Sequence, residues 1–190
     1  MAAITISRQL GSQGEAVAHA VAHRLGYRVV YRELINQAAQ RAGAPEMALA
    51  FLDVLGLLNI HPSAHQVQAY QQALHQSIEE WAAQGQVVIL GRAGCLWLKE
   101  RSDVLHVRIV APFHQRIERV AQQEAISLQA AQAQVEASDR GRQAYVQQYH
   151  QTDWADPQLY DLVLNTGRLT VDSAVALICL AQSQSLAMSA

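Results

Sequence analysis

The stretch ITISRQLGSQGEAVA, residues 4–18, decides the fold class of this chain. It begins with a short apolar run that ends at Ser7, a pattern typical of a buried β-strand. Gly11 and Gly14 follow in a turn, and apolar residues then recur at helical spacing until Gly26, where we expect the helix to end. A strand, a glycine-containing turn and a helix are the elements from which phosphate-binding sites of α/β proteins are built.

The alternation of strand and helix patterns continues along the chain. Further strands are predicted at 27–31, 87–91, 104–110 and 160–166, with helical patterns at 32–43, 45–60, 64–84, 113–150 and 170–182. Five strands separated by helices predict an open, three-layer α/β/α domain with a parallel sheet and helices on both faces. We expect the stripe from Val67 to Trp81 to be core, and the tail QSQSLAMSA to fray. Because ligands bind beyond the carboxyl ends of such strands, the residues that follow each strand are the candidates for a site.

Composition narrows the class of protein. The chain has 190 residues, enough for one domain, with 51% apolar residues and a formal net charge of −2. That balance favours neither a nucleic acid nor an anionic membrane as partner. No basic region precedes an apolar block at the N-terminus, so we expect a cytoplasmic protein. Cys95 and Cys179 lie in apolar contexts without paired spacing, and we expect them to be buried thiols.

The first turn is compared with the phosphate loop GxxxxGK[ST], in which backbone N–H groups, a lysine and a hydroxyl surround phosphate and magnesium. On that template Arg8 occupies the first glycine position, Gln13 the second, Gly14 the lysine position and Glu15 the hydroxyl position. Of the 14 lysines and arginines in the chain only one, outside this turn, is a lysine. The turn still permits the loop geometry, and Arg8 could supply the positive charge.

Two other interpretations of the turn stay open. A dinucleotide fingerprint is suggested by Gly11, Gly14 and Ala18, followed by Glu33 just after the second strand. It lacks one of the three glycines, and no tyrosine lies four residues before Lys99, so the Tyr-xxx-Lys set of short-chain dehydrogenases is absent. The other interpretation is that the glycines only shape a β–α connection.

Several segments, taken in order, resemble the cytidylate kinase-like family, a branch of the P-loop nucleoside monophosphate kinases. They are ITISRQLGSQGEAVAHAVAHRLGYRVVYRELI, VVILGRAGCLWL, VLHVRIVAPFHQRIERV and ASDRGRQAYVQQYHQTDWADPQLYDLVLNTGRL. The resemblance implies a P-loop NTPase-like fold in a single domain over 1–190, with a helical insertion at about 44–84 and a lid at about 125–152. It also implies ATP-dependent transfer of the γ-phosphoryl group, with Mg²⁺, to a nucleoside monophosphate of the (deoxy)cytidine type.

The resemblance assigns roles to particular residues. Donor phosphates would be bound by Arg8, Gly11, Ser12, Gln13 and Gly14, the acceptor by Arg32, Arg92 and Asp139, and the transferred group by the catalytic residues Arg140 and Arg142. Arg116 and Arg119, on the helix before the lid, would support it. A guanidinium suits these tasks because its planar fork matches phosphate oxygens. No metal-ligating set is expected, since the histidine pairs His19/His23 and His61/His65 lack a third ligand.

The chain departs from the family pattern at two places. Relatives commonly have GSGGREIA where this chain has GSQGEAVA, so a carboxylate, Glu15, stands in the first helical turn. They also tend to have an aspartate before RELI, where this chain has Tyr31. Two alternatives to a nucleotide kinase therefore remain: a weak or inactive nucleotide-binding relative with a regulatory role, and a helical interaction module on a scaffold sheet.

The segment MALAFLDVLGLLNI, residues 47–60, is apolar on nearly every face of the helix it predicts. It carries Asp53 and is shorter than a membrane span. A single amphipathic helix needs only one apolar stripe, so we expect part of the segment to form a homodimer interface. The protein should therefore have the mass of a dimer in light scattering at micromolar concentration, and a monomer mass would contradict this.

Overall fold

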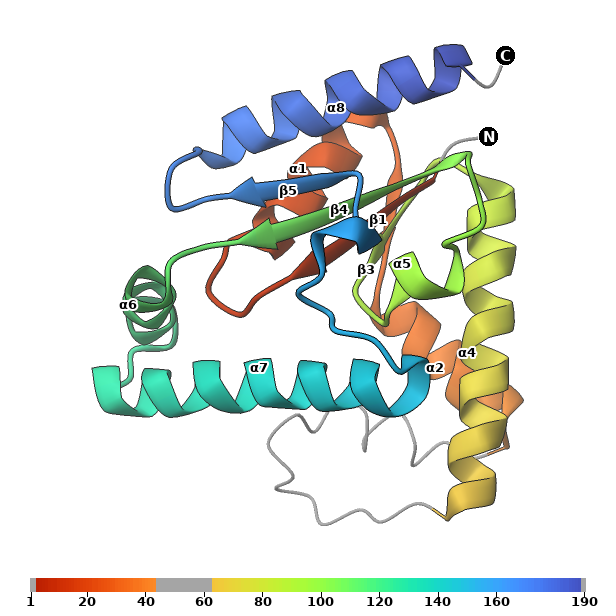
Figure 1. Ribbon diagram of the computed structural model, residues 1–190, viewed down its shortest axis with the longest axis horizontal. Coiled ribbons are helices and arrows are strands. Elements are labelled where there is room, and N and C mark those ends of the chain that lie inside the picture. The colour runs from red at the N-terminus through yellow and green to blue at the C-terminus, as the bar shows by residue number, and fades with distance from the viewer. Residues whose placement is uncertain (1–2, 44–62, 189–190) are drawn as a thin grey trace.

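The computed structural model describes residues 3–43 and 63–188 and is built around a five-stranded sheet (Figure 1). The strands are β1 (Ala3–Arg8), β2 (Arg28–Val30), β3 (Val87–Leu90), β4 (Val104–Val110) and β5 (Leu162–Asn165). All neighbouring strands are parallel, in the order β2-β3-β1-β4-β5, which confirms the predicted parallel sheet. In the common dinucleotide-binding order β2 lies beside β1. Here β3 separates them, so the strand order argues against the dinucleotide interpretation.

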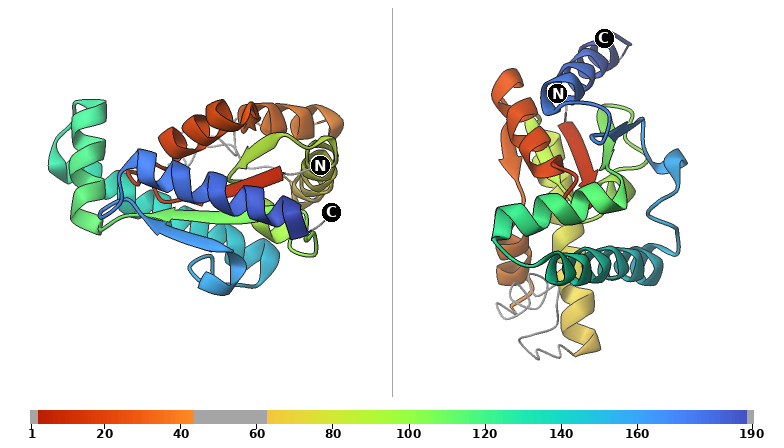
Figure 2. Two further views of the ribbon diagram at one scale, coloured as in Figure 1. Left: turned by 90° about the horizontal axis from the view of Figure 1, so that it is seen from above. Right: turned by 90° about the vertical axis from the view of Figure 1, so that its left-hand side faces the viewer.

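Helices cover both faces of the sheet and make three layers (Figure 2). On one face, α1 (Gly14–Leu25) and α8 (Val171–Met188) pack on side chains that include Ile4 and Ile6. On the other face, α2 (Arg32–Arg41) and α4 (Ala64–Gln84) pack on side chains that include Ala3 and Ile89. Alternate residues of a strand point to opposite faces, which is why the short apolar runs of these strands are buried on both sides.

The ends of several helices follow the sequence signals. Gly26, at φ 67°, ends α1, and Gly85, at φ 71°, ends α4, because glycine adopts left-handed backbone without steric strain. Ser63 begins α4 with a capping box that includes Gln66. The predicted core stripe of α4 is confirmed, with fully buried residues along its centre and partly buried ones at its two ends.

Two expectations about the chain ends and the apolar segment have different outcomes. The prediction of a frayed tail is wrong up to Met188, since α8 continues to that residue. Residues 183–188 contain neither glycine nor proline, so nothing in them stops the helix. The predicted helix at 45–60 and the dimer segment 47–60 lie outside the described residues. Cys95 is buried and Cys179 half-buried, and both thiols are free.

Three further helices and a short 3₁₀ helix complete the described part of the chain. They are α5 (Gly94–Trp97), α6 (Phe113–Glu124), α7 (Leu128–His150) and a short 3₁₀ helix, η1 (Pro157–Leu159). In Figure 1, α6 follows the carboxyl end of β4, and α7 runs the width of the molecule below the sheet. Within 3–43 and 63–188, no helix has the length and apolarity needed to span a membrane.

The buried histidine of β4 predicts a pH dependence of stability. The Nδ1 atom of His106 lies 2.7 Å from the hydroxyl of Thr5, and burial lowers the pKa of this imidazole although Asp161 opposes the shift. Burial, followed by the nearby His75, also lowers the pKa of His150. The unfolded chain therefore binds more protons than the folded one once the pH falls below about 6.5, the ordinary histidine value.

We expect the free energy of unfolding in urea to be highest above that value and to fall between pH 7.5 and pH 5.5. His106→Gln should reduce the difference between the two pH values, whatever its effect on stability at pH 7.5. His19→Gln, at an exposed position of α1, is the matched control and should leave the difference as in the wild type. An unchanged difference in His106→Gln would contradict the assignment.

Candidate active site

The connection between β1 and α1 is a compact loop of residues 9–13. Both the hydroxyl and the backbone N–H of Ser12 donate to the carbonyl oxygen of Gln9, at 2.8 and 3.3 Å. Gly11 at φ 76° and Gln13 at φ 59° have left-handed backbone, and a Cβ at Gly11 would lie 2.5 Å from a backbone oxygen of α6. Among the described residues no side chain caps α1. The N–H groups of its first turn are therefore available to bind an anion.

Arg8, the last residue of β1, extends from this junction toward the end of β3. Its side chain passes so close to Gly14 and Gly91 that a Cβ atom at either glycine would overlap it. The guanidinium carbon lies 4.9 Å from the centre of the Tyr31 ring. Arg92 approaches the same ring, with its guanidinium carbon 5.4 Å from the centre and Nη2 donating to the hydroxyl at 3.3 Å. Tyr31 therefore lies between two guanidinium groups.

These groups line a cavity of about 290 Å³ beyond the carboxyl ends of β1 and β3. Its charged residues are Arg8, Arg92 and Arg142, its aromatic residues Tyr31, Tyr145, Trp154 and Tyr160, and its remaining lining Thr5, Ile6, Ser7, Gly91, Ala93, Gly94, Cys95, Leu96, Gly141 and Val146. No aspartate or glutamate is among the described residues that line it. The cavity is suited to a ligand that carries several negative charges and a planar or apolar part.

The pKa shifts in the cavity reflect this concentration of positive charge. Burial, followed by the positive charge of Arg8, lowers the pKa of Arg142 to about 10. Burial also lowers the pKa of Arg8, with Arg92 acting in the same direction. For Tyr31 burial alone would raise the pKa, but Arg92 and Arg8 together bring it below the ordinary tyrosine value. A bound anion would stabilise the charged forms of Arg8 and Arg142.

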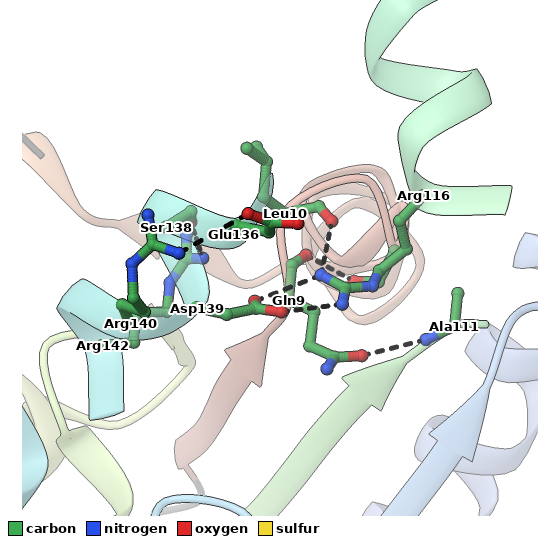
Figure 3. Close-up of polar contacts among 10 residues, drawn as sticks. Gln9, Leu10, Ala111, Arg116, Glu136, Ser138, Asp139, Arg140 and Arg142 are labelled. Atoms are coloured by element: carbon green, nitrogen blue, oxygen red, sulfur yellow. Dashed lines mark hydrogen bonds and ion pairs between the residues drawn. The ribbon is translucent and has the colours of Figure 1, made fainter. Parts of the chain in front are cut away.

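Helices α6 and α7 hold the outer side of the loop (Figure 3). Arg116 of α6, only 4% exposed in its side chain, forms a bidentate ion pair with Asp139 of α7, with N–O distances of 3.1 and 2.7 Å. Its Nη1 also donates to the carbonyl oxygen of Leu10 at 3.3 Å. Arg119 donates to the carbonyl oxygen of Gly11 at 3.3 Å. Two arginines of α6 thus bind loop carbonyls, and one of them ties the loop to α7.

The donor-phosphate residues predicted from the sequence lie together at this junction. Arg8 ends β1, Gly11, Ser12 and Gln13 form the loop, and Gly14 begins α1. Glu15 is exposed in the first turn of α1. Its negative charge acts against burial, which lowers the pKa of Arg8. The predicted donor-phosphate residues therefore all lie at the connection between β1 and α1.

The other predicted residues divide into two groups. Arg92 and Arg142 line the cavity, and the guanidinium of Arg142 also bonds to the Ser138 hydroxyl one helical turn before it. Arg32 has an exposed side chain at the start of α2, and Arg140 is exposed with its Nη1 3.6 Å from Glu136. Asp139 pairs with α6. The roles that the resemblance gives to Arg32, Asp139 and Arg140 stay predictions.

The aromatic wall of the cavity was not found by sequence reasoning. Tyr160, just before β5, donates its hydroxyl hydrogen to the Trp154 backbone oxygen at 2.8 Å and lies 3.4 Å from the Ser7 hydroxyl. Arg108 stacks on Trp154, with its guanidinium carbon 4.2 Å from the ring. The contacts of Tyr160 with Ser7 and of Arg108 with Trp154 join residues far apart in the chain, so no local pattern indicates them. For Tyr31 the sequence does give an indication, because the resemblance implies an aspartate at that position.

A second hollow lies beside the loop at Gln13. It is a shallow groove of about 410 Å³ between the loop and the β5–α8 connection, lined by Gln13, Arg119, Thr166, Gly167, Arg168, Leu169, Thr170 and Val171. Thr166 closes the inner side of this region, since its hydroxyl donates to the Ser12 carbonyl oxygen at 2.7 Å. The groove thus borders the loop at Gln13, and the arginine-lined cavity borders the end of β1 at Ser7 and Arg8.

Comparison with solved structures supports the fold. The structure of an uncharacterized protein from Eubacterium ventriosum superposes with a TM-score of 0.77 at 20% identity, covering 96% of this chain and 99% of that one. A gluconokinase from Sinorhizobium meliloti superposes with a TM-score of 0.58 at 15% identity, covering 100% and 98% of the two chains. A shikimate kinase from Bacteroides thetaiotaomicron gives 0.56 at 10% identity over 96% and 98%. The fold is therefore that of the P-loop kinases.

Sequence relatives cover smaller parts of the chain. A uronate isomerase of Corynebacterium glutamicum is 36% identical over 91 residues, which are 48% of this chain and 18% of that protein. A cytidylate kinase of Pyrococcus horikoshii is 36% identical over 101 residues, 52% of this chain and 50% of that one. A cytidylate kinase of Thermococcus kodakarensis is 30% identical over 140 residues, 73% and 67% of the two chains. The match thus spans half or less of the first two relatives.

The family itself is established by a match over most of the chain. A sequence model of the cytidylate kinase-like family covers residues 3–168, from the first residue of β1 to just beyond β5. This range contains the loop, the arginine-lined cavity and the helices α6 and α7. The chain belongs to the cytidylate kinase-like family.

Proposed function

We propose that this protein transfers the γ-phosphoryl group of ATP to a nucleoside monophosphate, of the (deoxy)cytidine type. The observation that carries the proposal is the convergence of Arg8, Arg92 and Arg142 on one cavity beside the uncapped N-terminus of α1. Phosphoryl transfer is catalysed mainly by positioning the two substrates and by positive charge around the transferred oxygens. The cavity supplies both without requiring a catalytic base, because the acceptor phosphate is already an anionic nucleophile.

On the donor side, the loop of residues 9–13 would bind the phosphates of ATP through backbone N–H groups at the start of α1. The groove beside Arg119 and Thr170 would take the nucleoside of the donor, since it opens directly next to Gln13 of the loop. Arg119 already donates to the Gly11 carbonyl oxygen, so donor and loop would share one organised surface. The phosphate chain of ATP would then run from this groove past the loop toward Arg8 and the arginine-lined cavity.

On the acceptor side, Arg92 follows β3 and would bind the monophosphate through its guanidinium fork. Tyr145 and Tyr31 line the same cavity and would lie near the base or ribose of the acceptor. Arg142, two turns from the end of α7, would neutralise charge on the transferred group. The acceptor type is proposed on the family and on the archaeal cytidylate kinases among the relatives.

The residues do not fit a resident magnesium site. No group of three or more histidine, cysteine, aspartate or glutamate side chains gathers anywhere in the described part of the chain. Glu15, which stands at the hydroxyl position of the loop, is an isolated exposed carboxylate. Mg²⁺ in kinases is held largely by the phosphates and water. No protein ligand and no step of the proposed reaction is therefore assigned to it.

A second candidate is a nucleotide-binding protein with little or no kinase activity. It is favoured by one observation, the negative charge of Glu15 in the first turn of α1, which repels an approaching phosphate. In that case nucleotides would bind and stabilise the protein, but no monophosphate would be phosphorylated.

ADP formation in a coupled assay, with ATP and a panel of nucleoside monophosphates, tests the proposal. We expect turnover to depend on the monophosphate and to be fastest with CMP or dCMP. Arg92→Gln and Arg142→Gln should each lower kcat/KM by about 100-fold or more, because each removes a charge that faces the transferred or accepting phosphate. Arg140→Gln should lose less activity, since its guanidinium is exposed and near Glu136.

Arg24→Gln, at the far end of α1 from the loop, is the control for loss of one arginine charge. Thermal denaturation with ATP and CMP should show a rise in the melting temperature for each nucleotide, by mass action. A rise with both nucleotides but no turnover with any monophosphate would establish the second candidate. No rise with any nucleotide would contradict both.

A further inference from the structure

The positions of the charge and the glycine at the β1–α1 junction are the reverse of those in the phosphate-loop pattern. In GxxxxGK[ST] the first glycine corresponds to residue 8 and the lysine to residue 14, whereas this chain has Arg8 and Gly14. We propose that the two have exchanged places: Arg8 is the cation that contacts the donor phosphates, and Gly14 is the residue that makes room for it. This assignment rests on the proposed function and names a binding residue of the same site.

Sterically, the two positions cannot both carry a side chain on this backbone. A Cβ at Gly14 would overlap the Cβ of Arg8, and would lie 3.0 Å from its Cγ and 3.2 Å from the Cβ of Ile109. The overlap is with the first atom of the arginine side chain, which cannot rotate away. Both backbones are also held, because Arg8 pairs with Ile109 across β1 and β4 and Gly14 begins α1. A large side chain at one position therefore requires glycine at the other.

The path of the Arg8 side chain directs its charge into the cavity. Beyond Gly14 the side chain runs to Gly91, where a Cβ would overlap its Nη1. Gly91 has φ 75° and its N–H donates to the Ile6 carbonyl oxygen at 2.9 Å, so the end of β3 is held against β1. The guanidinium lies over the ring of Tyr31 and lines the cavity together with Arg92. This is where the phosphate chain of the donor would meet the acceptor phosphate.

Lys99 does not replace the missing lysine. Its side chain is 66% exposed, its Nζ lies 3.6 Å from Glu100, and it is not among the residues that line the cavity. Arg8 is half-buried at the end of β1, and desolvation lowers the pKa of its guanidinium. A guanidinium presents several N–H groups in a plane and can bind two oxygens at once, so it can serve the role of a point-charge ammonium.

A four-way comparison tests the exchange in the full chain: wild type, Arg8→Gly, Gly14→Lys, and the double variant Arg8→Gly/Gly14→Lys. Affinity is measured by calorimetry for ATP and for inorganic tripolyphosphate. Arg8→Gly should weaken binding of both about 10- to 100-fold, as expected for loss of a charged hydrogen-bond donor. Gly14→Lys should lower the melting temperature and also weaken binding. The double variant, which has the conventional arrangement, should bind at least 10-fold more tightly than Arg8→Gly.

Gly91→Ala gives a second readout that leaves both exchanged positions unaltered. In the wild-type background it displaces the Arg8 guanidinium and should weaken ATP binding, whereas in the double variant no arginine is present to displace. The loss of affinity should therefore be larger in the wild type than in the double variant, although backbone strain at φ 75° acts in both. Arg24→Gln is the charge control, and circular dichroism with urea unfolding verifies that each variant is folded.

The outcomes separate this assignment from the proposed function. Wild-type affinity for ATP in Arg8→Gly, or a double variant that binds no better than Arg8→Gly, would overturn the exchange while leaving nucleotide binding intact. A wild type that binds ATP but phosphorylates no monophosphate would overturn the kinase activity alone, because affinities are measured without turnover. A wild type that binds neither ATP nor tripolyphosphate would overturn both.

Discussion

The carboxyl end of β1 is held on both sides, and every part of the candidate site is placed relative to it. Ile6 pairs with Leu90 of β3, and Arg8 pairs with Ile109 of β4. A strand bonded along both edges cannot shift without breaking two ladders of hydrogen bonds, so the position of the residue that follows is set to a fraction of an ångström. The start of α1, the end of β3 and the Arg8 side chain all meet at this point. A charge on such a strand end is more rigidly placed than one on a free loop.

The helices around the site depend on a second constraint, the ion pair between Arg116, which is buried, and Asp139, which is half-buried. Removal of Asp139 would leave the desolvated Arg116 guanidinium without its counter-charge. Arg116 binds the loop carbonyl of Leu10 with the same guanidinium. Asp139 lies three residues before Arg142, which faces the cavity from α7. The pair thus joins the loop to the helix that carries Arg142. A movement of α7 would therefore displace both the loop and this arginine.

Three guanidinium groups share one cavity, and burial, followed by the positive charge of Arg8, lowers the pKa of Arg142 to about 10. Tyr31 reduces the repulsion by placing its ring and hydroxyl between Arg8 and Arg92. Such unfavourable concentration of charge is typical of sites selected for binding, because the ligand supplies the missing counter-charge.

The sequence by itself determined the elements and the fold class, since these depend on local patterns. Short apolar runs predicted the five strands, and Gly26 and Gly85 predicted where α1 and α4 end, because helix geometry is set within a few residues. The resemblance indicated the family and the residues of the loop. The prediction of a frayed tail was wrong because the tail, although polar, has no helix breaker before Met188, where α8 ends.

Only the tertiary structure decided which side chains meet. The strand order β2-β3-β1-β4-β5 brings Arg8, Arg92 and Arg142 to one cavity, although these residues are separated by up to 134 positions in the chain. In the folded chain Asp139 pairs with Arg116, whereas its sequence neighbour Arg140 is exposed. No sequence pattern indicates that Arg8 excludes a side chain at position 14. Steric overlap and the desolvation of charge depend on distances in space, and spacing along a chain does not specify them.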